Sequence, residues 1–327
     1  MGHFRTKMRV LFITATRIGD AVLSTGLINH IHKKYPEAQI TVACGPAAAE
    51  IFETMPNLER LIVLDKMLFS LHWLRFWFLC APYFWSLIID LRNSPLSYLL
   101  FSRKQKHLGR SNADKHRVLT LAEVLGLQQT PPSPILWPSK QHRVRAEKII
   151  PSAGFTLALG PAANWAAKTW DPEKFITLVR RLSSKDGLMP NCRIAVFGRD
   201  DERPKILRII QSIPEGKRLD LVGKLKLVEI YACMERCNLY IGNDSGLMHM
   251  AAASGIPTLG LFGPSKEELY APWGENCASI RTIESFDEIH PDQFDHRKSG
   301  SLMDGLSVEA VEKKASELLR KKNGSCA

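Results

Sequence analysis

Residues 9–29, RVLFITATRIGDAVLSTGLIN, start as an apolar run of strand length and continue, through a glycine-containing turn, into a helical pattern. A strand followed by a helix is the unit from which doubly wound parallel sheets are built. The turn lacks the G-x-G-x-x-G spacing of a nicotinamide-binding unit, which argues against dinucleotide redox chemistry. A lone acid, Asp20, follows the strand. It either favours the helix N-terminus electrostatically or faces a ligand at the carboxyl end of the strand.

Similar apolar runs alternate with helical patterns along the whole chain. They occupy residues 39–45, 60–65, 86–92, 155–160, 192–198, 239–244 and 257–263. Such strands, separated by helices, predict parallel sheets that are covered on both faces. Prolines concentrate in QQTPPSPILWPSK, residues 128–140, which is typical of a linker. We therefore predict an α/β fold of two doubly wound parallel-sheet domains, residues 1–150 and 151–327. The chain closes with an amphipathic helical pattern, SVEAVEKKASELLRKK.

The composition is that of a globular protein with an excess of basic residues. Of the 327 residues, 45% are hydrophobic and 24% charged, and the formal net charge is +11. This charge favours an anionic partner, which can be a nucleic acid, a phosphorylated small molecule or an anionic membrane. The seven scattered cysteines do not have metal-ligand spacing, so no metal site is expected. The first residues do not resemble a secretory signal, and we expect a cytoplasmic location.

Residues 67–89, MLFSLHWLRFWFLCAPYFWSLII, are unusually aromatic. His72, Arg75 and Pro82 interrupt the apolar run, which argues against a spanning helix. Two interpretations remain open: a helix that contacts a membrane surface, or a helix and a strand packed into the core.

The second half contains a candidate phosphate site in CNLYIGNDSGLMHMAAASGIP, residues 237–257. The backbone N–H groups at Ser245, Gly246 and Leu247 would face an anion at the start of a helix. Asp244 can instead serve only as a helix cap, and His249 as an ordinary helix histidine. In the loop before TWDPEKF, Lys168 can reach the same phosphates or can simply be solvated.

A third turn, AVFGRDDERPK at residues 195–205, places Asp200, Asp201 and Glu202 after another strand. These acids can bind ribose hydroxyls or favour the start of the next helix.

Three segments together resemble the heptosyltransferases of bacterial lipopolysaccharide core synthesis, glycosyltransferase family nine. They are residues 9–45, 161–175 and 240–274. The resemblance implies a GT-B architecture, in which two Rossmann-like domains face a central cleft. It places a nucleotide-sugar donor, ADP-heptose in the first instance, on the C-terminal domain and a lipid-linked or lipopolysaccharide core acceptor on the N-terminal one. The closing helix can pack back on the N-terminal domain. The implied reaction inverts the anomeric carbon with no cofactor and no obligatory metal.

The resemblance also assigns roles to individual residues. It implies that Asp20 is the general base for the acceptor hydroxyl. The donor-binding residues that it implies are Lys168, Asp244, Ser245, Gly246, Leu247, His249 and, more loosely, Glu202. The acceptor-side residues are Arg17, Gly19, Arg92 and Arg110.

The loop at residues 161–167, PAANWAA, is poor in the hydroxyls that often bind phosphate in this family. The alternatives are therefore a transferase that uses another nucleotide-sugar, or a catalytically inactive nucleotide-binding homologue. An anionic donor and acceptor account for the basic charge without nucleic acid, because no nucleic-acid-reading motif is present. We expect peripheral attachment to the cytoplasmic face of the inner membrane.

Overall fold

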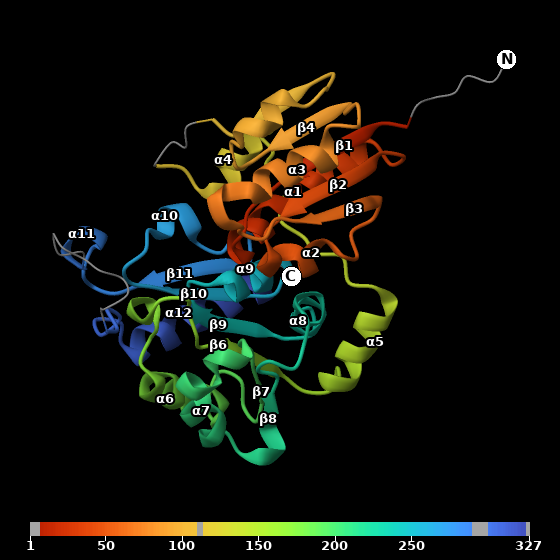
Figure 1. Ribbon diagram of the computed structural model, residues 1–327. Coiled ribbons are helices and arrows are strands. Elements are labelled where there is room, and N and C mark those ends of the chain that lie inside the picture. Colours follow the sequence, from red (N-terminus) through yellow and green to blue (C-terminus); the bar gives the residue numbers. More distant parts are fainter. Residues whose placement is uncertain (1–6, 110–113, 290–299, 325–327) are drawn as a thin grey trace. The chain divides into compact units, whose positions relative to one another are not determined.

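The computed structural model describes residues 7–109, 114–289 and 300–324 (Figure 1). The chain divides into two compact units, Met1–Trp137 and Pro138–Ala327. This division differs from the predicted 150/151 boundary by one helix, α5 (Lys140–Ile149). The reason is that α5 packs on α8 (Leu227–Met234) of the second unit.

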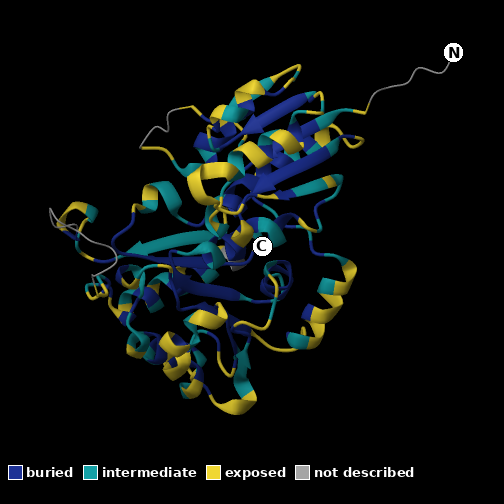
Figure 2. Ribbon diagram, viewed as in Figure 1, coloured by how far each residue is buried: buried dark blue, intermediate teal, exposed yellow. Residues whose placement is uncertain are grey.

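The first unit is built on a five-stranded parallel sheet with the order β3-β2-β1-β4-β5. Its strands are β1 (Arg9–Ile13), β2 (Gln39–Cys44), β3 (Leu58–Val63), β4 (Leu87–Asp90) and β5 (Gln105–His107). Its α-helices are α1 (Ile18–Lys34), α2 (Ala49–Phe52), α3 (Leu71–Cys80) and α4 (Arg117–Glu123). The central strand β1 is almost entirely buried because it has a strand on each side and helices on the faces (Figure 2).

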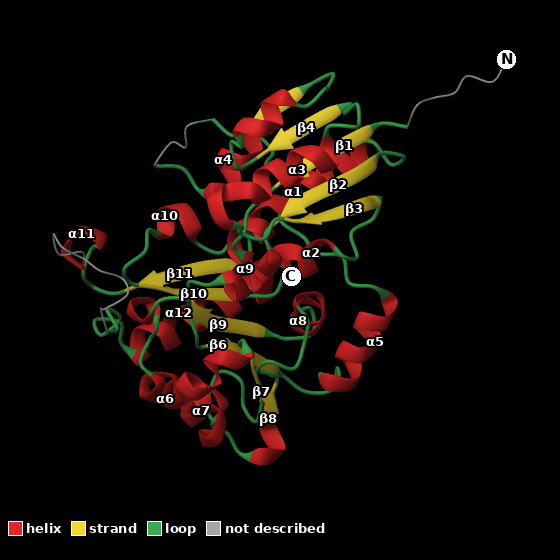
Figure 3. Cartoon of the chain, in the orientation of Figure 1, coloured by secondary structure: helices red, strands yellow, loops and turns green. Residues whose placement is uncertain are grey.

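The second unit is built on a six-stranded parallel sheet with the order β11-β10-β9-β6-β7-β8. Its strands are β6 (Thr156–Gly160), β7 (Arg193–Val196), β8 (Arg218–Asp220), β9 (Leu239–Asn243), β10 (Thr258–Phe262) and β11 (Cys277–Arg281). Besides α5 and α8, its α-helices are α6 (Pro172–Ser183), α7 (Arg203–Ser212), α9 (Gly246–Ala253), α10 (Glu267–Tyr270), α11 (Phe286–Ile289) and α12 (Val308–Gly324). Helices flank the strands of each unit (Figure 3). The predicted fold class, α/β with two parallel sheets, is confirmed.

Both sheets reverse their strand order between the first strand and the fourth. In the first unit the chain starts at β1, adds β2 and β3 on one side, and then crosses to β4 on the other. In the second unit the same reversal separates β6 and β9. Open α/β sheets bind ligands outside the carboxyl ends of the strands at this switch point. The ends of β1, β4, β6 and β9 are therefore where functional side chains are expected.

The aromatic segment forms the short 3-10 helix Leu68–Ser70, helix α3 and strand β4. Helix α3 buries Phe76 and Cys80 in the core and leaves much of its remaining surface exposed. No helix within residues 7–109, 114–289 and 300–324 combines the length and the apolar character needed to cross a bilayer.

Helix α12 contributes Val308, Val311, Ala315 and Leu318 to the core of the second unit. It contacts α6, β10 and β11. The apolar face that the sequence pattern predicts is thus buried within its own unit.

Candidate functional site

Asp20 is the third residue of α1 and lies beyond the carboxyl end of β1, at the switch point of the first sheet. Its side chain is half-buried, and it has no hydrogen bond or ion pair with any residue that the structure describes. The N-cap position belongs to Arg17, whose side chain makes no capping bond. Asp20 is the acid in the first turn, where it favours the positive helix end. Its carboxylate oxygens nevertheless remain available to a ligand.

A second carboxylate at the same sheet edge, Asp90 at the end of β4, is fully buried, and both of its oxygens accept hydrogen bonds. Its Oδ1 accepts a hydrogen bond from the Arg92 N–H at 2.7 Å. Its Oδ2 accepts from the Ser94 N–H at 2.8 Å and from the Ser97 hydroxyl at 2.7 Å. Asp90 therefore fixes the loop after β4, and both of its oxygens already accept hydrogen bonds from that loop.

The predicted acceptor-side residues lie in different surroundings. Gly19 is in the first turn of α1, and Arg17 is exposed beside it. The Arg92 guanidinium lies 4.8 Å from the ring centre of Trp73, on α3. Burial lowers the pKa of Arg92, while Asp90 and Cys44 oppose that shift. Arg110 lies outside the described residues.

In the second unit, Lys168 and Asp244 form a nearly buried ion pair. Lys168 ends the short 3-10 helix after β6, and Asp244 follows β9, the neighbouring strand. The Lys168 Nζ lies 2.5 Å from Asp244 Oδ2, and the two side chains are 15% and 8% exposed. The same Nζ lies 4.7 Å from the ring centre of Trp165. The structure thus brings together two residues that are far apart in sequence, at the switch point of the second sheet.

Asn243, which was not among the predicted site residues, joins the loop after β6 to the end of β9. It is the last residue of β9 and is fully buried. Its Nδ2 donates to the Pro161 carbonyl at 2.8 Å, and its Oδ1 accepts from the Trp170 N–H at 3.1 Å. A polar residue at the end of an otherwise apolar buried strand, immediately before Asp244, is the feature that could have indicated this role.

The remaining residues of the candidate phosphate loop begin helix α9. Ser245 occupies the N-cap position with extended backbone, and its hydroxyl makes no capping bond. Gly246 and Leu247 are the first two helical residues, so their N–H groups belong to the helix start that can bind an anion. His249 is buried one turn later, and its ring lies 6.5 Å from that of Tyr270. The alternative that Asp244 is only a helix cap does not fit, since its carboxylate pairs with Lys168.

Two glycines allow a buried tyrosine to lie beneath this edge of the sheet. A Cβ on Gly160 would come within 1.9 Å of the Tyr240 hydroxyl, and one on Gly242 within 2.5 Å. Because a real Cβ cannot approach so closely, both positions require glycine as long as Tyr240 is present. Burial raises the pKa of Tyr240, so its hydroxyl stays protonated at neutral pH.

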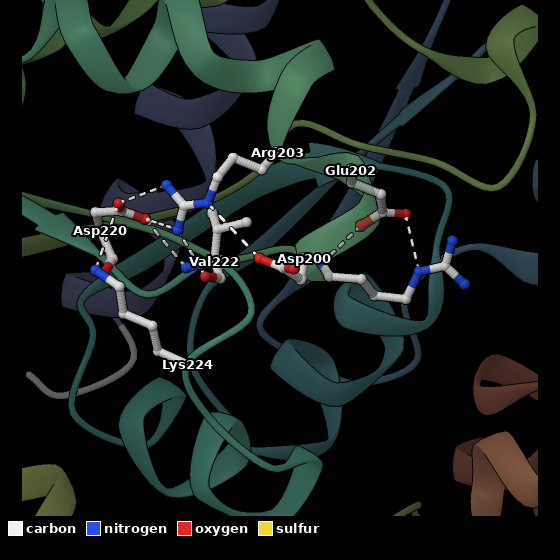
Figure 4. Close-up of polar contacts among 7 residues, drawn as sticks. Asp200, Glu202, Arg203, Asp220, Val222 and Lys224 are labelled. Carbon is white, nitrogen blue, oxygen red and sulfur yellow. Dashed lines mark hydrogen bonds and ion pairs between the residues drawn. The ribbon is translucent and has the colours of Figure 1, made fainter.

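Glu202 is already engaged at the start of its own helical segment (Figure 4). Its Oε2 accepts from the Arg199 N–H at 2.8 Å, and its Oε1 lies 3.5 Å from Arg199 Nε. Next to it, Arg203 binds both Asp220 carboxylate oxygens, at 2.8 and 3.2 Å. The acids of this turn therefore already have arginine partners, and a ribose contact from Glu202 stays a prediction.

Among the side chains in residues 7–109, 114–289 and 300–321, no three potential metal ligands of the His, Cys, Asp or Glu type gather in one place. The six cysteines that the structure describes are not activated nucleophiles either. Burial raises the pKa values of Cys44 and Cys80 to about 12, so both thiols are protonated at neutral pH.

Comparison with known proteins defines the class. The model of glycosyltransferase family 9 (heptosyltransferase) matches residues 77–293. Lipopolysaccharide heptosyltransferase 2 of Salmonella typhimurium is 25% identical over 322 residues, which cover 86% of this chain and 90% of that relative. The solved family 9 glycosyltransferase of Veillonella parvula is 22% identical with a TM-score of 0.79, covering 96% of this chain and 98% of that one. The structure of E. coli heptosyltransferase WaaC with ADP is 17% identical with a TM-score of 0.69, covering 95% of this chain and all of that one.

Two Rossmann-type sheets in one chain, shared with these solved neighbours, define the GT-B class of glycosyltransferase fold. The chain belongs to glycosyltransferase family 9, the heptosyltransferase family.

Proposed function

We propose that this glycosyltransferase moves heptose from ADP-heptose to a hydroxyl of a lipopolysaccharide core acceptor, with inversion and without an obligatory metal. The acceptor would bind to the first unit and the donor to the second. The observation that carries this proposal is the free carboxylate of Asp20 at one switch point. It complements the lysine held at the other. An inverting displacement needs a base on the acceptor side and positive charge on the leaving-group side.

Asp20 would act as the general base. An alcohol is a poor nucleophile while it is protonated, so its proton moves to the Asp20 carboxylate as the oxygen attacks the anomeric carbon. A bond forms between the acceptor oxygen and that carbon, and the bond from the carbon to the phosphate oxygen of ADP breaks. The half-buried position of Asp20, with no partner among the described residues, suits this role. Asp90 is unsuited to it because its oxygens are occupied.

Lys168 and the start of α9 would bind the diphosphate. The Lys168 ammonium supplies charge, and the N–H groups of Gly246 and Leu247 supply directed donors. Asp244 positions Lys168, and Asn243 fixes the distance between the loops that carry them. The positive charge and the hydrogen-bond donors of the protein can thus stabilise departing ADP, which supports a metal-independent reaction.

The choice of heptose and lipopolysaccharide core rests on the relatives. The Salmonella relative is named as a lipopolysaccharide heptosyltransferase, and the WaaC structure contains ADP. The alternative is a transferase of the same fold with another nucleotide-sugar, favoured by the alanine-rich loop 161–167.

Exposed apolar groups around α3 support contact with the cytoplasmic face of the inner membrane. Leu68 is 81% exposed and Phe69 95%, at the short helix that precedes α3, and Phe78 on α3 is also exposed. A net charge of +11 adds attraction to anionic lipids. A lipid-linked acceptor would then be presented at the surface where the enzyme binds.

A donor screen tests the proposal. The purified chain is incubated with core acceptor and a panel that includes ADP-heptose, other ADP-sugars and UDP-sugars, and release of nucleoside diphosphate is measured. We expect release with ADP-heptose, unchanged by a metal chelator, and an inverted anomeric centre in the product by NMR. Release with another donor alone would support the alternative. A product with retained anomeric configuration, or a loss of activity with the chelator, would refute the proposed mechanism.

A further inference from the structure

A cavity of about 950 Å³ lies at the amino-terminal edge of the first sheet. It is lined by Arg9 and Gln39, which begin β1 and β2, by Leu87, which begins β4, and by His30 and Lys34 in the C-terminal part of α1. Asp20 follows the carboxyl end of β1, which is the opposite edge of this parallel sheet. The cavity is therefore separate from the proposed catalytic edge.

Its lining is strongly basic and contains no carboxylate. The Lys and Arg residues that line it are Lys7, Arg9, Lys34, Arg103, Lys104 and Lys106. None of the six forms an ion pair with an acidic side chain in the described part of the chain. Arg9 instead stacks on the Tyr83 ring, 5.0 Å from its centre. Burial lowers the pKa of His30, and the charge of Lys34 lowers it further.

Like charges held together without counter-charges repel one another, and a bound anion removes that repulsion. Lys34 also lies at the carbonyl end of α1, whose negative end it offsets. The volume exceeds that of a bare ion and suits a phosphate that is part of a larger molecule.

Exposed aromatic side chains border the basic surface. Phe84 lines the cavity and is 64% exposed, and Phe101 is 73% exposed. The two lie on neighbouring segments, because the Trp85 N–H donates to the Phe101 carbonyl at 2.9 Å. Aromatic rings beside basic residues are typical of surfaces that meet lipid headgroups.

We infer that this cavity binds the phosphate of an anionic lipid headgroup. It would add a basic membrane contact to the apolar one proposed above around α3, and so rests on that part of the proposed function but not on the transfer chemistry. A water-soluble phosphate ester has the same recognisable group, and the experiment separates the two sources.

The test compares two triple variants of the full chain with equal loss of charge. The first removes three cavity cations, Arg103→Gln, Lys104→Gln and Lys106→Gln. The matched control removes exposed cations of the second unit, Arg180→Gln, Lys185→Gln and Lys313→Gln. Thermal unfolding confirms that both variants fold. Flotation is measured with phosphatidylcholine vesicles, with and without phosphatidylglycerol, and calorimetry is performed with glycerol phosphate.

We expect wild type and control to float with the phosphatidylglycerol vesicles, and the cavity variant to partition roughly a hundredfold less. If the cavity variant loses only the binding of glycerol phosphate, the cavity is an anion site whose ligand is a soluble phosphate ester. Equal binding of both probes by the two variants would overturn the inference. Binding of ADP by calorimetry reports on the second unit. Its absence in the wild type would contradict the proposed function while leaving the anion site intact.

Discussion

The Lys168 ammonium lies 2.5 Å from the Asp244 carboxylate, across neighbouring strands of the second sheet. The pair fixes the lysine at the place where a diphosphate would meet the start of α9. Because both side chains are largely buried, each depends on the other for compensation of its charge.

Replacing Lys168 with Met should weaken ADP binding by at least about tenfold, because a charge-assisted contact to phosphate is lost. It should also lower the free energy of unfolding by about 3 kcal/mol, since the Asp244 carboxylate is left without its partner. Calorimetry with ADP and urea unfolding measure the two effects. Lys185→Met, at an exposed position, is the control and should change neither. Unchanged ADP affinity in the Lys168 variant would remove this residue from the donor site.

Asn243→Ala should destabilise the second unit by about 2–3 kcal/mol. The substitution leaves the Pro161 carbonyl and the Trp170 N–H without their present partner in a buried setting. Urea unfolding provides the measurement. Asn276→Ala removes an exposed amide that donates to the Gly255 carbonyl, and its expected effect is below about 0.5 kcal/mol. Similar losses in the two variants would show that Asn243 does not join the loops as described.

Gly242→Ala should strongly destabilise the chain, because the new Cβ would lie 2.5 Å from the Tyr240 hydroxyl and 2.6 Å from the Gly160 carbonyl oxygen. Adding Tyr240→Phe removes the hydroxyl and should restore part of the lost stability. Thermal unfolding of the single and double variants measures this coupling. Purely additive effects would show that Tyr240 does not impose the need for glycine.

The central strands and one edge strand, β3, followed directly from the sequence, and the other three edge strands did not. The runs at residues 10–15 and 239–244 are apolar because β1 and β9 are buried on both faces. Two of the missed strands, β5 and β8, are QKH and RLD, each three residues long and paired with one neighbour only. Such short polar edges leave no apolar pattern to detect.

The candidate site could be predicted only in part from the sequence, because some of its contacts join segments that are far apart in the chain. Asp20 and Asp244 could be placed at strand ends from the local pattern alone. The pairing of Lys168 with Asp244, and the bonds of Asn243 to the loop after β6, depend on β6 lying beside β9. That adjacency is set by the crossing of the chain at the switch point, which no local pattern encodes.

The exposed apolar residues of the short helix before α3 should contribute to vesicle binding independently of charge. Leu68→Ser with Phe69→Ser should reduce partitioning into phosphatidylglycerol-containing vesicles by roughly tenfold or more. The reason is that burial of each apolar side chain in the bilayer favours binding by about 1.5–3 kcal/mol of free energy. Val144→Ser with Phe155→Ser alters exposed apolar residues of the second unit and serves as the control. Flotation gives the readout. If both pairs of changes reduce binding equally, the surface around α3 has no special part in it.

The rate of transfer by Asp20→Asn tests the central claim most directly. Asparagine keeps the size of the side chain but cannot accept the proton, so the rate of ADP release with saturating donor and acceptor should fall by about 10²–10⁴-fold. ADP affinity and thermal stability should stay at wild-type values, as in the exposed control Asp186→Asn. This combination is the result that we predict. Turnover within a few-fold of wild type would show that Asp20 is not the base.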